Sequence, residues 1–248
     1  MAILRAERLV RRFGGLAAVD GVDLEVGAGE ILGVIGPNGA GKTTLFALIA
    51  GSIPATSGRV WLEDQPVTGL PAHRVVHAGI ARTHQIVRPF GTLTVLENVT
   101  VGAISGGRRA GKDPRDLAAE LVRSVGLAER AHDYPSALTL AGRKRLELAR
   151  ALATAPRVLL LDEVIAGVNP AEAQQLAELI RQLRDRHSLS IVMIEHVMPA
   201  VMSLSDRIAV LDHGKKIAEG TPAAVAADPR VIEAYLGTGA AAPPPHSP

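Results

Sequence analysis

A run of glycines around one lysine and one threonine is the strongest chemical signal in this chain of 248 residues. The run fits the pattern G-x-x-x-x-G-K-[ST] in full, and its members are Gly36, Pro37, Asn38, Gly39, Ala40, Gly41, Lys42 and Thr43. Glycines let several backbone N–H groups converge on phosphate oxygens, because no Cβ atom stands in the way. Lys42 supplies a charge for the β and γ phosphates, and the hydroxyl of Thr43 can ligate Mg²⁺. The pattern predicts a nucleotide-binding loop, without choosing between a kinase, a GTPase and an ATPase.

Two adjacent carboxylates, Asp162 and Glu163, follow the apolar run 158–161. If this run is a strand of a parallel sheet, its carboxyl end faces the ligand crevice. Asp162 would then hold Mg²⁺, directly or through water, and Glu163 would position or deprotonate the attacking water. Taken alone, the two acids fit an ordinary exposed loop equally well. The nucleotide-binding loop earlier in the chain favours the catalytic interpretation.

Short apolar runs and amphipathic segments predict the scaffold that would position these residues. Residues 31–35, 158–161 and 191–194 predict buried parallel strands. A helix over residues 42–50 would follow the nucleotide-binding loop directly and point its positive end at the anion. A second helix is indicated by apolar residues at helical spacing over 176–183, after a capping pattern of Asn169, Pro170 and Glu172. Strands that alternate with helices predict an α/β fold with a mainly parallel sheet.

The remaining segments suggest additions to this core. Residues 3–10 and 20–26 alternate and predict N-terminal strands, while residues 207–211 and 215–219 predict a hairpin. The pattern of residues 87–155 is helical, with a loop-like interruption over 102–114, and predicts an inserted helical subdomain. We therefore expect a core of residues 1–86 and 156–238. Residues 239–248 are rich in alanine and proline and predict a disordered tail.

Composition excludes several classes of protein. Hydrophobic residues make up 47% of the chain but aromatic residues only 2%, so aliphatic side chains must fill the core. A formal charge of +2 is too small to indicate a nucleic-acid partner. The chain has no cysteine, which excludes disulfides and thiolate metal sites. Because no apolar run approaches the roughly 20 residues of a membrane-spanning helix, and no signal peptide is evident, we expect a soluble protein that meets a membrane only through a partner.

The order of the motifs resembles that of the ATP-binding cassette (ABC) ATPases from about residue 3 to residue 237. Gln85 matches the glutamine of the family's Q-loop, and residues 138–142 (Leu-Thr-Leu-Ala-Gly) stand in the place of the signature LSGGQ. Residues 166–169 match the D-loop, and His196 matches the switch histidine. Phe13 stands where an aromatic ring usually stacks on adenine. The resemblance implies a P-loop NTPase core of the RecA type with N-terminal antiparallel strands and a helical subdomain that carries the signature.

The resemblance also implies a composite ATP site with a role for each matching residue. Two cassettes would dimerise head to tail, and each ATP would lie between the nucleotide-binding loop of one and the signature of the other. Glu163 would be the general base, His196 would contact the γ phosphate, and Gln85 would sense Mg²⁺ or water. The implied metal ligands are Thr43, Gln85 and Asp162. The implied nucleotide contacts are Phe13, Gly36, Asn38, Gly39, Ala40, Gly41, Lys42, Thr43, Thr44, Thr139, Ala141 and Gly142.

Three residues depart from the family pattern. Ala141 replaces the second glycine of the signature, Gly142 replaces its glutamine, and Val164 replaces the proline that usually follows the catalytic glutamate. Either the methyl group of Ala141 crowds the close approach to the partner's γ phosphate, or the backbone amide still points correctly, because alanine tolerates the start of a helix; we favour the second interpretation. Two residues have rival interpretations. Phe13 is also a candidate core residue, and His196 is also a candidate buried structural histidine, although its position after residues 191–194 favours the functional role.

Local strings resemble one branch of the family, the importer ATPases for hydrophobic and branched-chain amino acids. The strings are residues 82–90, 142–150, 166–170 and 231–237. The resemblance implies transmembrane permease subunits, a second ATPase subunit (identical or different) and, indirectly, a solute-binding protein, at the cytoplasmic face of the inner membrane. The alternatives are a urea or amide importer, a lipopolysaccharide-export ATPase and a soluble ABC ATPase without a transport role. A P-loop kinase is a further alternative, in which the signature helix and the late histidine have no role.

Overall fold

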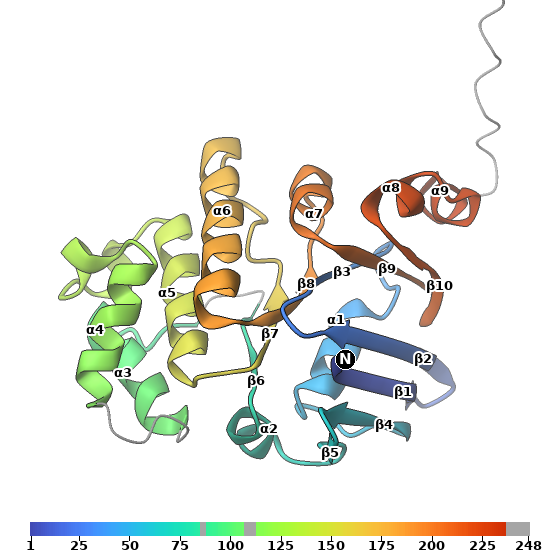
Figure 1. The fold of residues 1–248 in the computed structure, drawn as a ribbon, viewed down its shortest axis with the longest axis horizontal. Helices are drawn as coiled ribbons and strands as arrows, with labels where there is room; N and C mark the ends of the chain where they lie inside the picture. Colours follow the sequence, from blue (N-terminus) through green and yellow to red (C-terminus); the bar gives the residue numbers. More distant parts are fainter. Residues whose placement is uncertain (85–87, 107–112, 237–248) are drawn as a thin grey trace, which may run out of the picture.

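The protein contains two β-sheets with a helix packed between them (Figure 1). The computed structural model describes residues 1–84, 88–106 and 113–236. A four-stranded antiparallel sheet has the order β2-β1-β4-β5, and a six-stranded sheet has the order β10-β9-β3-β8-β7-β6. The strands are β1 (Ala2–Phe13), β2 (Leu16–Gly27), β3 (Ile31–Ile35), β4 (Ser57–Leu62), β5 (Gln65–Pro66), β6 (Ile80–Arg82), β7 (Val158–Asp162), β8 (Ser190–Ile194), β9 (Arg207–Asp212) and β10 (Lys215–Gly220).

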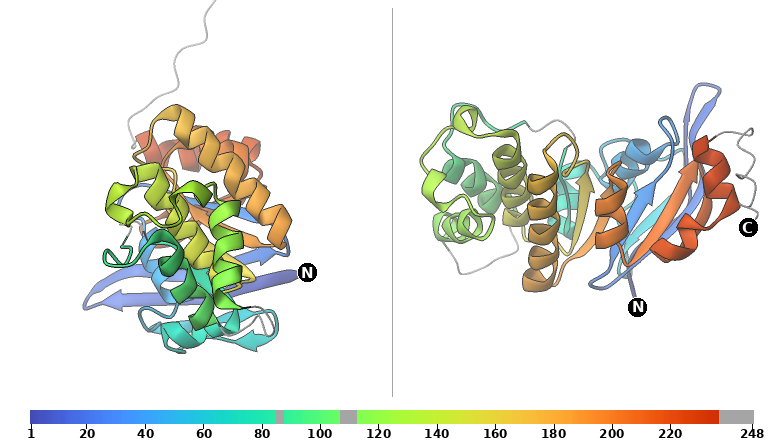
Figure 2. Two further views of the ribbon diagram at one scale, coloured as in Figure 1. Left: turned by 90° about the vertical axis from the view of Figure 1, so that its left-hand side faces the viewer. Right: turned by 90° about the horizontal axis from the view of Figure 1, so that it is seen from above.

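The helices lie between and outside the two sheets. They are α1 (Lys42–Ile49), α2 (Ala72–Ala78), α3 (Val95–Gly106), α4 (Pro114–Ser124), α5 (Leu140–Ala153), α6 (Pro170–His187), α7 (Met198–Leu204), α8 (Pro222–Ala226) and α9 (Pro229–Leu236). Helices α3 to α5 form one end of the molecule, and α8 and α9 lie at the opposite end (Figure 2). No helix in the described ranges is both long and apolar enough to cross a membrane.

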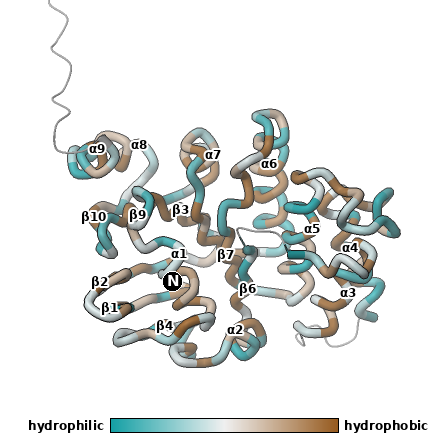
Figure 3. The backbone as a smooth tube through the Cα atoms, turned by 180° about the vertical axis from the view of Figure 1, so that it is seen from behind, coloured by the Kyte–Doolittle hydropathy of each residue, from teal (hydrophilic) through white to brown (hydrophobic). Residues whose placement is uncertain are grey.

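The larger sheet is buried on both faces, which explains its near-continuous apolar strands. Strands β3, β6, β7, β8 and β9 run parallel, and β10 closes one edge antiparallel to β9. The side chains of β7 alternate, so that Leu159 and Leu161 join one hydrophobic cluster and Val158 and Leu160 another. The hydropathy colouring shows β3 and β7 as brown segments in the middle of the molecule (Figure 3). The predicted strands and the C-terminal hairpin are confirmed.

Helix α1 occupies the space between the two sheets, where it begins directly after the nucleotide-binding loop. Its buried residues Leu45, Phe46 and Ile49 share one cluster with apolar residues of β1, β2 and β4 from the smaller sheet and of β3, β7 and β8 from the larger one. Because both sheets enclose this helix, its N-terminus is fixed relative to the carboxyl ends of the parallel strands. The predicted helix over 42–50 is confirmed to within one residue.

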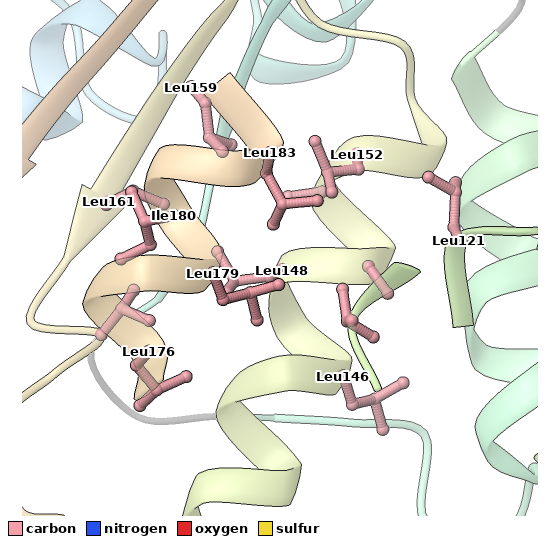
Figure 4. Close-up of a cluster of buried hydrophobic side chains, with 14 of the residues drawn as sticks. Leu121, Leu146, Leu148, Leu152, Leu159, Leu161, Leu176, Leu179, Ile180 and Leu183 are labelled. Carbon is pink, nitrogen blue, oxygen red and sulfur yellow. The ribbon is translucent and has the colours of Figure 1, made fainter. Parts of the chain in front are cut away.

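The far face of the larger sheet is covered by α6, which links it to α5. Asn169 and Glu172 form a complete capping box at the start of α6, as the sequence predicts. Leucine and isoleucine side chains of α6 lie against those of β7 on one side and of α5 on the other (Figure 4). This shared cluster connects the helical end of the molecule to the strand that carries Asp162.

The interruption predicted over residues 102–114 is wrong in its first part, because α3 continues to Gly106. A Cβ atom at Gly102 would lie 2.7 Å from the carbonyl oxygen of Arg150, and one at Gly106 would lie 2.5 Å from the Cα atom of Thr154. Both glycines therefore serve close packing of α3 against the end of α5, and neither breaks the helix. Asp113 then caps the start of α4 by accepting from the backbone N–H groups of Arg115 and Asp116.

Candidate functional site

The nucleotide-binding loop joins the end of β3 to the start of α1 and depends on glycine at two positions. Gly36 has φ 149°, and an added Cβ atom would lie 2.0 Å from the carbonyl oxygen of Leu211. Gly41 has φ 100°, and an added Cβ atom would lie 2.2 Å from the carbonyl oxygen of Ala18. Any other residue would therefore clash with backbone at either position.

The amide groups of this loop and of the first turn of α1 are arranged for an anion. Gly41 caps α1 without any side-chain hydrogen bond, which leaves the first backbone N–H groups of the helix for a ligand. Asn38, Gly39 and Thr43 are exposed, Thr44 is half-buried and Ala40 is buried. The loop can thus present its backbone and the hydroxyl of Thr43 to a phosphate group.

The side chain of Lys42 folds back onto the nucleotide-binding loop. Its ammonium group donates to the carbonyl oxygens of Gly36, at 2.7 Å, and of Pro37, at 2.9 Å. Burial lowers the pKa of Lys42, while the charges of Glu163 and Asp162 act in the opposite direction. The lysine therefore lies within the electrostatic reach of both carboxylates, as expected for groups that share one ligand.

Asp162 ends β7 and is almost completely buried. Its Oδ2 accepts from Arg82 at 2.7 Å, and its backbone N–H donates to the hydroxyl of Thr83 at 3.1 Å. Its Oδ1 is buried and has no hydrogen-bond partner within the described part of the chain. An unpaired buried carboxylate oxygen suits a divalent cation, which takes oxygen ligands.

Thr43 and Asp162 line the same cavity of about 480 Å³. Basic side chains dominate the rest of its wall, which is formed by Arg82, His84, Arg88, Glu147 and Arg150. The hydroxyl of Thr43 and the free Oδ1 of Asp162 provide the kind of oxygen donors that Mg²⁺ prefers. The arginines would attract a polyphosphate to the same space.

Glu163 and His196 meet at the ends of neighbouring strands. Nε2 of His196 lies 2.7 Å from Oε1 of Glu163, and the backbone N–H of Glu163 donates to the carbonyl oxygen of Ile194 at 2.9 Å. The side chain of His196 is 41% exposed, which excludes its interpretation as a buried structural histidine. A carboxylate and an imidazole in contact at the rim of a phosphate-binding site can order an attacking water and accept its proton.

One expected nucleotide contact, Phe13, belongs to the N-terminal sheet. Phe13 ends β1 with 48% of its surface exposed, so the rival interpretation as a core residue is wrong. The guanidinium of Arg11 lies 4.5 Å from the centre of its ring. Gln85 lies outside the described residues.

Comparison with known proteins agrees with this arrangement. A family model described as ABC transporter matches residues 19–166, which is more than half of the chain. The chain belongs to the ABC transporter family. It is an ABC ATPase, and it hydrolyses ATP to drive transport.

The similarity to relatives of this ABC ATPase extends over almost the whole chain. It is 43% identical to the high-affinity branched-chain amino acid transport ATP-binding protein LivG of Escherichia coli K12, over 95% of this chain and 98% of that protein. It is 40% identical, with the same coverage, to the corresponding protein BraF of Pseudomonas aeruginosa. A crystal structure of a nucleotide-free ATP-binding cassette from an ABC transporter superposes with a TM-score of 0.88 at 32% identity, over 96% of this chain and all of that one. A second family model, described as branched-chain amino acid ATP-binding cassette transporter, matches residues 215–241.

In this ABC ATPase the signature begins helix α5. Thr139 caps the helix, and its hydroxyl accepts from the backbone N–H of Gly142 at 3.2 Å. In this structure that amide is therefore engaged in the cap of its own helix. Ala141 is only 6% exposed, so its methyl group packs inward and leaves the surface unobstructed. The exposed apolar side chain of the signature is Leu140, at 46%, which the sequence reasoning overlooked.

Sequence reasoning also missed three charged residues around the carboxylates of this ABC ATPase. Arg82 pairs with Asp162, and the only signal for it was an arginine at the end of a short strand beside the acidic one. Lys144 and Glu195 are buried, and both form hydrogen bonds with the backbone of the turn that follows β7. No motif or spacing in the sequence predicts that this lysine of the signature helix and this glutamate next to His196 contact the turn.

Proposed function

We propose that this cassette energises the import of branched-chain or other hydrophobic amino acids across the inner membrane, from its cytoplasmic face. The carrying observation is its identity of 43% to LivG over nearly the full length of both chains, which includes the C-terminal segment matched by the branched-chain model. The name of BraF supports the same substrate class. The substrate itself would be selected by membrane and solute-binding subunits.

The catalytic centre would be built by the groups that converge at the carboxyl ends of β3, β7 and β8. Lys42 would leave the carbonyl oxygens of Gly36 and Pro37 and donate to the β and γ phosphates. The loop amides would hold the same phosphates. This exchange replaces two neutral acceptors of the lysine with charged ones, which favours nucleotide binding.

Mg²⁺ would be held by Thr43 and Asp162, with Gln85 as a further ligand, and would neutralise charge on the phosphate oxygens. Glu163 would accept the proton of the attacking water, because its carboxylate lies beside His196 at the rim of the site. His196 would then donate to the γ phosphate. Phe13 would cover the adenine from the end of β1.

A second cassette, identical or different, would complete the site with its signature. The helix start at Thr139 and the buried methyl group of Ala141 support this role, since that methyl group does not project from the surface of the signature. The helical subdomain of residues 87–155 would contact the permease subunits. The net charge of +2 supports a protein partner and no nucleic acid.

The test is ATP turnover in proteoliposomes by this chain assembled with permease subunits of a branched-chain amino acid transporter. Leucine with its binding protein should stimulate turnover and accumulate inside, and the Glu163→Gln variant should do neither. Stimulation by urea or short amides alone, or by lipopolysaccharide alone, would assign the chain to one of the alternative transporters. Turnover that needs no membrane subunit and responds to DNA or ribosomes would remove the transport role.

A further inference from the structure

The turn that carries Glu163 has an unfavourable backbone conformation, which other parts of the molecule must stabilise. Glu163 has φ 52°, in the left-handed region that residues with a side chain rarely occupy. The next two residues, Val164 and Ile165, are buried and apolar. Val164 lacks the fixed φ that a proline would impose, so contacts from elsewhere must hold this turn in place.

Two buried charged side chains from different elements make those contacts. The ammonium group of Lys144, on the signature helix α5, donates to the carbonyl oxygen of Glu163 at 2.7 Å. The carboxylate of Glu195, after β8, accepts from the backbone N–H of Ile165 at 2.6 Å. Lys144 is 5% exposed and Glu195 is 1% exposed. Groups of this kind are rarely buried so deeply unless they are paired.

The electrostatics of the two residues are coupled across the turn. Burial raises the pKa of Glu195 to about 7, and the nearby ammonium group of Lys144 opposes this rise. Burial lowers the pKa of Lys144, and the carboxylates of Glu195 and Glu163 oppose this change. Each residue thus favours the charge of the other, with the backbone of Glu163 to Ile165 between them.

The same loop after β8 also contacts the side chain of Glu163. His196 directly follows Glu195, and its Nε2 lies 2.7 Å from Oε1 of Glu163. One loop therefore contacts the carboxylate through His196 and the backbone two residues later through Glu195. Lys144 adds a third contact from a different part of the molecule, the helix that begins at the signature.

We propose that Lys144 and Glu195 are positioning residues that together hold the turn of Glu163 in its catalytic geometry, and that Lys144 makes this geometry depend on the placement of the signature helix. The proposal rests on the role of Glu163 as the base. Neither residue lines the cavity of Thr43 and Asp162. A shift of α5 would move the ammonium group of Lys144 away from the Glu163 carbonyl and release the strained turn.

The decisive experiment compares Lys144→Met, Glu163→Gln and the double variant in the full transporter. Single-turnover ATP hydrolysis and the Kd for a fluorescent ATP analogue are measured for each. Lys144→Met should slow hydrolysis by about 10- to 100-fold and change the Kd by less than about threefold, because it perturbs the base and leaves the phosphate loop intact. In the Glu163→Gln background the same substitution should slow hydrolysis no further, since residues that act as a unit are not additive.

Conservative variants separate positioning from folding. Lys144→Arg keeps a donor and should restore at least half of the rate, and Glu195→Gln keeps the acceptor for Ile165 and should cost less than Glu195→Leu. Lys215→Met, at a lysine whose side chain is 66% exposed, serves as the matched control and should leave the rate unchanged. Equal losses in Lys144→Arg and Lys144→Met would overturn the proposal.

The role of Glu163 and the positioning role can fail separately. Normal turnover in Glu163→Gln would show that Glu163 is not the base, and the positioning role of Lys144 and Glu195 would then lose its basis. A large loss in Glu163→Gln, with a full additional loss on adding Lys144→Met, would keep the base and overturn the positioning role alone.

Discussion

Nε2 of His196 lies 2.7 Å from Oε1 of Glu163, although the two residues belong to different strand ends. The contact exists because β7 and β8 are parallel neighbours in register, with Asp162 opposite Ile194. The residues that follow each strand therefore emerge at the same edge of the sheet. This relationship ties the orientation of the proposed base to the group that would contact the γ phosphate.

Replacing Glu163 by glutamine should separate binding from hydrolysis. The amide keeps the shape of the side chain and cannot accept a proton from water. We expect ATP turnover to fall by about 10²- to 10⁴-fold, the usual contribution of general-base catalysis, with nucleotide affinity retained. The measurement is steady-state phosphate release beside equilibrium binding, and size-exclusion chromatography in ATP should show a trapped dimer.

Replacing Lys42 by alanine should act on binding itself. Lys42 carries the positive charge at the mouth of the loop, and its removal leaves the phosphates without a counter-ion there. Losing one partner of a hydrogen-bonded charge pair costs roughly 2–5 kcal/mol, so we expect the affinity for ATP to fall by about 10²-fold or more. Titration with a fluorescent nucleotide measures this, and an unchanged Kd would exclude Lys42 from the site.

Restoring glycine at position 141 tests the signature. The methyl group of Ala141 is buried, so Ala141→Gly removes buried contact area and opens little space at the surface. We expect ATP turnover to stay within about twofold of the natural chain and stability to fall by roughly 1 kcal/mol, as for a glycine within a helix. Turnover that rises severalfold would show that the methyl group does obstruct the composite site.

The buried carboxylate of Glu195 should make stability depend on pH. Burial raises its pKa from 4.5 to about 7, so the folded chain binds this proton more tightly than the unfolded chain does. The resulting stabilisation is fully present when the pH is below the pKa of Glu195 in the unfolded chain. It is lost as the pH rises through the pKa of Glu195 in the folded chain. As the pH rises from about 5 to about 8, the melting temperature of the natural chain should therefore fall relative to that of the Glu195→Gln variant. The exposed Glu129→Gln variant is the control, and parallel curves for Glu195→Gln and the natural chain would contradict the assignment.

The contact of α3 with α5 predicts a cost for any side chain at Gly102. An alanine Cβ would lie 2.7 Å from the backbone oxygen of Arg150, and overpacking of this kind costs roughly 1–3 kcal/mol. Gly91→Ala is the matched control, because nothing lies within 4 Å of a Cβ atom there. Chemical denaturation of both variants gives the difference, and equal stability would show that the two helices separate easily.

The features that sequence reasoning found are those with local signals. The glycine pattern of residues 36–43, the apolar run before Asp162 and the capping box at Asn169 are each written in a few consecutive residues. Lys144 and Glu195 could not be found in this way, because their meeting depends on how α5 packs beside the sheet. The same limit explains Gly102, which looked like a helix breaker until the closeness of Arg150 gave the glycine a reason within a helix.

The close seating of α3 on α5 also has a mechanical meaning. At Gly102 and Gly106 the backbone of α3 lies so close to the end of α5 that a Cβ atom at either position would clash with it, which leaves little room for one helix to slide past the other. We therefore expect α3 and α5 to move together as one rigid body. A displacement of α3 should then also displace α5, and with it Thr139 at the start of the signature helix.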